Sequence, residues 1–68
     1  MRIRYDKKED AMYLELAKGK YSQTRKVSDT VLVDEDVKGK ILGIEILDAT
    51  KNIKAFNPRK TKFEIATV

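Results

Sequence analysis

The 68-residue chain contains no cysteine, no histidine and no tryptophan. Without cysteine or histidine, a single chain cannot build a thiol nucleophile, a serine triad or an imidazole-ligated metal centre. Disulfides are excluded as well, which is compatible with a reducing compartment. These absences remove the most common catalytic constellations. We therefore expect a protein that is not an enzyme and that needs no cofactor and no metal.

Long hydrophobic runs are also missing. Met1 to Asp6 has no apolar stretch behind its charges, so the sequence does not predict a signal peptide there. The longest apolar run is interrupted by Glu45 and is far too short to span a membrane. We expect a cytoplasmic protein that has no membrane association.

The size of the chain predicts one domain with a small core. A domain this short buries only about 60% of the surface that its unfolded chain exposes. Small domains usually compensate with disulfides, a metal or a partner chain. Since the composition disfavours the first two, we expect a homo-oligomer, most simply a dimer. We expect residues 1–68 to form one unit, with a sheet and a helix in 1–56 and a basic connector and terminal strand in 57–68.

The net charge of +4 is unevenly distributed. Residues 1–27 carry eight basic and four acidic side chains, residues 28–50 carry two and six, and residues 51–68 carry five and one. The middle block is therefore acidic and the last block basic. Such segregation predicts surfaces of opposite charge unless folding brings the blocks together.

The stretch from Val31 to Leu47 has the composition of a β-hairpin. Two apolar runs flank an acidic segment that contains a glycine. The sequence from Asp36 to Gly39 suits a type I turn, in which the aspartate accepts a local hydrogen bond and the glycine supplies a positive φ.

The second arm of this hairpin has two unlike faces. Leu42, Ile44 and Ile46 share one face and are the predicted core side. The other face carries Gly43 and Glu45 between apolar residues, which suggests partial cover by a helix or another chain. A glycine inside a strand also points to a bulge or to a close backbone approach.

Sequence patterning predicts four further strands. Arg2–Tyr5 and Ala11–Leu16 are expected to form a hairpin, and Tyr21–Val27 is weakly patterned and suits an edge strand. Lys62–Val68 alternates again and predicts a terminal strand.

A short helix is predicted after the central hairpin. Asp48 is a suitable N-cap, and Ala49, Ile53 and Phe56 fall at helical spacing on one apolar stripe. Pro58 disfavours the helical conformation at the preceding residue, so the helix is expected to end there after about two turns. The fold class is α+β: an antiparallel β-meander of five or six strands with one short helix packed on the sheet.

Four stretches, taken in this order, carry a family resemblance: Tyr5-Asp6, Glu9-Asp10-Ala11-Met12-Tyr13-Leu14, Asp34-Glu35-Asp36 with Gly39, and Gly43-Ile44-Glu45-Ile46-Leu47-Asp48-Ala49. In these stretches the chain resembles a small prokaryotic family catalogued as domain of unknown function 2283. The resemblance covers roughly residues 1–54 and departs from the family at Lys38, where an Asp or Asn is usual, and in a longer segment after residue 57. It implies a compact antiparallel sheet with a short helix and no established activity. Some members are encoded beside small toxin-like proteins, which implies an antitoxin-like or partner-binding role.

Three acidic features have both a functional and a structural interpretation. Asp34-Glu35-Asp36 either places two carboxylates on one strand face for a hard cation or keeps a hairpin tip charged. Glu45 is either a general base in apolar surroundings or a cross-strand partner of Arg2, Arg4 or Arg25. Asp10 is either a catalyst or a turn acceptor. We favour the structural interpretation of all three.

The last block supplies the best candidate contact residues. Clustered cations attract phosphates in a salt-sensitive manner. No recognised nucleic-acid motif accompanies them, and the spacing of Phe56 and Phe63 predicts core positions rather than exposed stacking surfaces. A solvated basic face is the alternative. The preferred function is a non-enzymatic module that binds a protein, with weak nucleic-acid binding as the second hypothesis. The candidate contacts to a partner or to nucleic acid are Lys51, Lys54, Arg59, Lys60 and Lys62.

Overall fold

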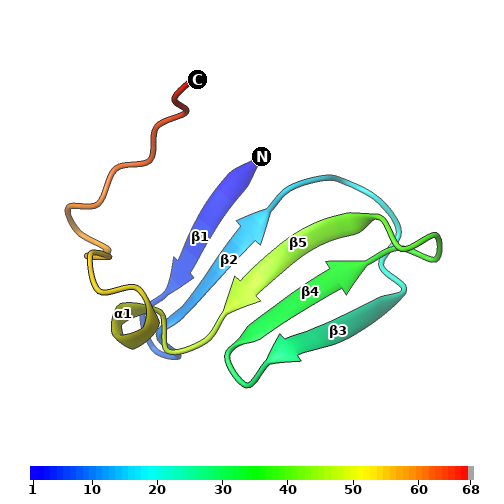
Figure 1. Cartoon of the computed structure of the whole chain (residues 1–68), viewed down its shortest axis with the longest axis horizontal. Coiled ribbons are helices and arrows are strands. Elements are labelled where there is room, and N and C mark those ends of the chain that lie inside the picture. Colours follow the sequence, from blue (N-terminus) through cyan, green and yellow to red (C-terminus); the bar gives the residue numbers. More distant parts are fainter. Residues whose placement is uncertain (68) are drawn as a thin grey trace.

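The computed structural model describes residues 1–67 and folds them into one antiparallel sheet with a short helix at one end (Figure 1). The strand order is β1-β2-β5-β4-β3. The predicted α+β class is confirmed, with five strands in the described residues rather than six. The elements are β1 (Arg2–Asp6), β2 (Ala11–Glu15), β3 (Gln23–Ser28), β4 (Val31–Glu35), β5 (Ile41–Ile46) and α1 (Ala49–Asn52).

The sheet consists of a hairpin, β1–β2, and a three-stranded meander, β3–β4–β5, which meet between β2 and β5. Met12 lies opposite Ile46 and Leu14 opposite Ile44 in that central pairing. The segment 16–22 crosses the ends of β5 and β4 to reach the far edge, where β3 begins (Figure 1). The amides of residues 16 and 17 donate to the Leu42 carbonyl over 2.9 and 3.1 Å, which anchors the start of this crossing.

The turn between β4 and β5 forms as predicted. The amide of Gly39 donates to the Asp36 carbonyl over 3.0 Å, and Gly39 has a positive φ of 83°. The Asp36 carboxylate also accepts from the amides of Lys38 and Lys40 at 2.9 and 2.8 Å. Only a residue that tolerates positive φ suits this turn, and glycine does so at the lowest cost.

The core lies under the helix, on the side of the sheet that we call the helix face. Met12, Ala49 and Phe56 are buried there, with Tyr5 and Ile53 packed against them. The Tyr5 and Phe56 rings meet edge to face at 5.3 Å. The predicted apolar stripe of the helix region therefore reaches the core. Further half-buried members are Leu14 and Ile46.

The predicted length and cap of the helix were wrong. α1 spans only Ala49–Asn52, and Ile53 is already extended with φ −114° and ψ 94°. Phe56 reaches the core from a turn, in which its amide donates to the Ile53 carbonyl over 2.9 Å. Asp48 has a left-handed backbone, φ 50° and ψ 46°, and its side chain makes no capping hydrogen bond.

The predicted terminal strand was also wrong over residues 62–67, and Val68 lies outside the described residues. The alternating pattern is present, but a strand needs a backbone partner. Within residues 1–67, segment 62–67 makes no backbone hydrogen bond to the sheet. Phe63, which the spacing placed in the core, is 58% exposed, and Ile65 is 95% exposed.

Among residues 1–67, no helix is long and apolar enough to cross a membrane.

Candidate functional site

Asp10 joins the β1–β2 turn to the start of α1. Its carboxylate accepts from the Tyr5 hydroxyl and from the Thr50 hydroxyl, each at 2.7 Å. The Thr50 amide also points at this carboxylate, at 3.2 and 3.3 Å from its two oxygens. The Asp10 carbonyl accepts from the Ala49 amide over 2.8 Å. Asp10, which lies 40 positions before Thr50, thus supplies the helix cap that we expected from Asp48.

These hydrogen bonds also affect the protonation of the Asp10 carboxylate. The hydrogen bond from Tyr5, followed by that from Thr50, lowers the pKa of Asp10 below its ordinary value of 3.8. The same carboxylate raises the pKa of Tyr5 above 10.0. Hydrogen bonds to the ionised form favour that form, so the Asp10 carboxylate is a strong acceptor that joins the first hairpin to α1. Our structural interpretation of Asp10 is therefore the one that the contacts support.

The side of the sheet that faces away from α1, which we call the open face, is organised around Tyr13. The Arg4 guanidinium lies over the Tyr13 ring, 4.9 Å from its centroid. The Tyr13 hydroxyl donates to the Asp34 carboxylate at 3.1 Å, so the side chain reaches from β2 across β5 to β4. Burial, followed by this hydrogen bond, raises the pKa of Tyr13 above 10.0.

A chain of hydroxyl groups continues from Asp34 to the far edge. The Thr24 hydroxyl donates to Asp34 over 2.7 Å, and the Tyr21 hydroxyl lies 2.7 Å from the Thr24 oxygen. Because Thr24 has one hydroxyl proton and gives it to the carboxylate, Tyr21 donates to Thr24. Asp34 thereby ties together strands that lie on both sides of it.

Gly43 makes room for Tyr13 on β5. A Cβ atom at this position would lie 2.5 Å from Tyr13 Cζ, closer still to the hydroxyl, and 2.9 Å from the Leu14 carbonyl oxygen. Since Cβ contacts below 3.0 Å require displacement, only glycine permits this crossing. Both predicted alternatives occur here: the Leu14 carbonyl is the close backbone approach, and the β4–β5 register shifts beside Gly43, between Asp34 and Glu35.

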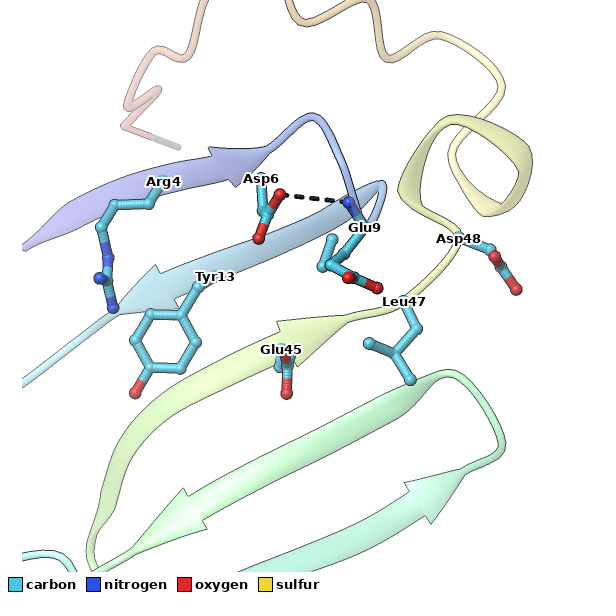
Figure 2. Close-up of a pocket in the computed structure, with 8 residues that line it drawn as sticks. Arg4, Asp6, Glu9, Tyr13, Glu45, Leu47 and Asp48 are labelled. Atoms are coloured by element: carbon cyan, nitrogen blue, oxygen red, sulfur yellow. Dashed lines mark hydrogen bonds between the residues drawn. The ribbon is translucent and has the colours of Figure 1, made fainter.

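A hollow of about 500 Å³ lies beside Tyr13 at the α1 end of the open face. Figure 2 shows Arg4, Tyr13 and Glu45 projecting from neighbouring strands toward the same side of the sheet. Four carboxylates and one guanidinium supply its charge, while Ala11 and Leu47 supply apolar surface. The residues that line it are Arg4, Asp6, Glu9, Ala11, Tyr13, Glu45, Leu47 and Asp48.

The expected ion pair of Glu45 does not form. Its neighbours across the sheet are Tyr13 and Leu32, neither of which carries a charge. Arg2 lies 3.6 Å from Glu15, and Arg25 lies 3.3 Å from Glu35. Within residues 1–67, Glu45 and Arg4 make no salt bridge. The predicted cross-strand pairing was wrong because the register places the cations opposite other residues.

The three adjacent acidic residues have separate contacts. Asp34 serves the hydroxyl chain on the open face, and Asp36 holds the turn. Glu35 is buried on the helix face and accepts from Gln23 and Arg25, each at 3.3 Å. Among the described residues, no three acidic side chains lie close enough to hold a metal ion. The carboxylates stabilise strand pairing and a turn.

The five predicted contact cations lie along α1 and the segment that follows it. All five are exposed, and none forms a salt bridge within residues 1–67. Hydrogen bonds around Asn57 hold the middle of this segment in a turn: the amides of Lys60 and Thr61 donate to the Asn57 carbonyl at 3.0 and 2.7 Å. The structure thus places the exposed side chains of these cations along one segment of the chain, none of them lining the hollow. They are Lys51, Lys54, Arg59, Lys60 and Lys62.

Sequence reasoning missed the hollow on the open face. It recognised Gly43 and Glu45 individually, and alternation already placed Tyr13 away from the core side of β2. The missing signal was the β2–β5 pairing, which sets Tyr13 opposite Glu45. This pairing joins segments that are about thirty residues apart, and no local pattern encodes it.

Residues 2–49 match the family model described as "Protein of unknown function (DUF2283)". Since this match covers more than half of the chain, the chain belongs to that family. No curated protein and no solved structure matches the chain. The matched residues include those that line the hollow, as well as Tyr5 and Asp10, whereas Thr50, the five cations and segment 62–67 lie after the match.

Proposed function

We propose that the domain is a non-enzymatic, cytoplasmic protein-binding module that works as a homodimer and docks its partner on the open face. The partner that fits is a small protein with a basic surface, as expected if the module is the antitoxin-like partner of a toxin-like protein. The observation that supports this proposal is the hollow beside Tyr13. It combines apolar surface with an excess of carboxylates, although the chain as a whole carries +4.

The side chains around the hollow suit a lysine or arginine from a partner. Glu45 is half-buried and forms no salt bridge with a cation of its own chain within residues 1–67. A cation that docks there gains a charge-assisted hydrogen bond, and its aliphatic stem contacts Leu47 and Ala11. The Tyr13 ring offers the kind of rigid aromatic surface that dominates many protein interfaces.

The test is a pull-down of the tagged full-length chain from its own host, with and without nuclease. We expect one stoichiometric protein that survives nuclease, binds the Glu45→Lys variant at least tenfold more weakly, and binds the Asp29→Lys variant as it binds the wild type. Asp29 provides the control because it lies in the β3–β4 turn, is exposed and does not line the hollow. Equal binding by both variants, or the loss of all partners after nuclease, would contradict the proposal.

The second candidate function is weak, non-specific binding of nucleic acid by the exposed cations after Ala49. One observation favours it: Phe63 follows Lys62 directly and is exposed, so one aromatic ring accompanies the cations. Neutralising all five cations to glutamine should then lower affinity for single-stranded RNA and flatten its salt dependence. A matched variant that neutralises Lys7, Lys8, Lys18, Lys20 and Lys40 has the same net charge and is expected to keep its affinity.

A further inference from the structure

We propose that segment 62–67 of one chain pairs antiparallel with β1 of a second copy, so that two reciprocal pairings join a symmetric dimer. This inference rests on the homodimer in the proposed function and assigns its interface. It starts from apolar side chains that the single chain leaves exposed beside one another. Ile3, Phe63 and Ile65 line one shallow groove of about 330 Å³ next to the β1 edge, together with Met1, Arg2 and Glu64.

The two edges of the sheet differ in how well they could accept another strand. β3 is exposed along its whole length, carries Arg25 and Lys26, and shifts register against β4 between residues 26 and 28. Charges and bulges of this kind discourage edge pairing. β1 pairs with β2 in an unbroken register from Arg2 to Asp6, so its outer edge is regular.

The side chains of the two segments match in one antiparallel register. Placing Ile65 opposite Ile3 sets the aromatic Phe63 opposite Tyr5 on the same face. On the other face, this register sets Glu64 opposite Arg4 and Lys62 opposite Asp6. Aromatic pairs and opposite charges directly across a ladder stabilise it. A shift of two residues in either direction sets like charges opposite each other, Lys62 with Arg4 or Glu64 with Asp6.

The geometry of the chain favours a second copy as the partner. The turn around Asn57 and a hydrogen bond from the Thr61 hydroxyl to the Ala55 carbonyl hold the point where segment 62–67 leaves the domain. From that point the segment runs beside its own β1 in the opposite direction without pairing to it (Figure 1). A second copy can move as a rigid body to meet the segment, so both pairings form without breaking the turn. A two-fold symmetry axis then relates the two pairings, so that the β1 edge of each chain pairs with segment 62–67 of the other.

The absence of cysteine allows a direct test with two single-cysteine variants of the full chain. Ile3→Cys protein is mixed with Ile65→Cys protein, oxidised mildly and analysed on non-reducing gels, and light scattering gives the mass of the wild type. Because each chain carries one cysteine, a mixed disulfide between the variants reports pairing between chains only. We expect a mixed covalent dimer, and little of it when Val37→Cys, at the exposed hairpin tip, replaces Ile65→Cys.

The register has its own test by charge reversal. Glu64→Arg should raise the dimer dissociation constant by about tenfold, since the symmetric dimer contains this pair twice. Combining it with Arg4→Glu should restore most of the affinity. A wild-type dimer without the mixed disulfide would overturn the inference and leave the proposed homodimer standing. A monomeric wild type would overturn both, while partner capture on the open face would still be measurable.

Discussion

The two faces of the sheet use their polar groups differently. On the helix face and its margin, the carboxylates of Asp10 and Glu35 accept hydrogen bonds from groups that hold other elements in place. On the open face, Glu45 and Arg4 lie beside a hollow and make no salt bridge within residues 1–67. The comparison indicates that the helix-face carboxylates hold elements together, whereas the open face combines one such carboxylate, Asp34, with charges that make no salt bridge within residues 1–67.

The largest expected effect comes from closing the space under Tyr13. Gly43→Ala places a methyl group against the Tyr13 ring and the Leu14 carbonyl, so we expect a loss of about 1–3 kcal/mol in the free energy of unfolding. Urea denaturation measures this. Gly19→Ala is the control because its new Cβ meets only the flexible end of Leu42, and its loss should be smaller. Equal losses would show that the Tyr13 crossing is not tightly packed.

The second prediction breaks the anchor on the helix face. Asp10→Asn weakens the acceptor for Tyr5 and Thr50, so α1 should detach more readily and Tm should fall by several degrees. Asp48→Asn is the matched control, because the Asp48 side chain makes no capping bond. If the control lost as much stability, the cap would belong to Asp48 after all.

The third prediction concerns pH and carries a smaller effect. The folded pKa of Asp10 lies below its ordinary 3.8, so its contribution to stability is complete above that pH and declines as pH falls through the folded pKa. The raised pKa of Tyr5 makes the same bond lose strength when pH rises above 10.0. Thermal unfolding of wild type and Tyr5→Phe across this range should show a shallower pH dependence in the variant. Parallel curves would contradict the linkage.

The smallest effect on stability is expected from a substitution of Glu45 on the open face. Glu45→Lys removes no ion pair of the described chain, so its Tm should stay close to that of the wild type while partner binding falls. Circular dichroism and the pull-down measure the two properties on one sample. A large drop in Tm would show that Glu45 stabilises the fold.

Local patterns predicted the elements well where the decisive interactions are also local. The turn from Asp36 to Gly39 and the strands that flank it were predictable because alternation and turn chemistry act within a few residues. The cap of α1 was not, since Asp10 reaches the helix from the first hairpin. The hollow was also missed, because Arg4, Tyr13 and Glu45 meet only after β1, β2 and β5 pair.

Lys62–Val68 has the alternating pattern of a strand, but the strand that this pattern predicts does not form over residues 62–67. Phe63 and Ile65 alternate with polar residues as in a strand, yet over residues 62–67 the segment does not pair with the sheet. The alternating pattern of a segment indicates that it can form a strand, but it does not indicate whether another strand lies close enough to pair with it.

The most direct test of the central claim is an NMR titration of the isotope-labelled full chain with the protein captured in the pull-down. The account predicts that the amide shifts concentrate on the open-face residues around Arg4, Tyr13 and Glu45, with little change along Lys51 to Lys62. Shifts confined to that basic segment, with the open face unchanged, would contradict it.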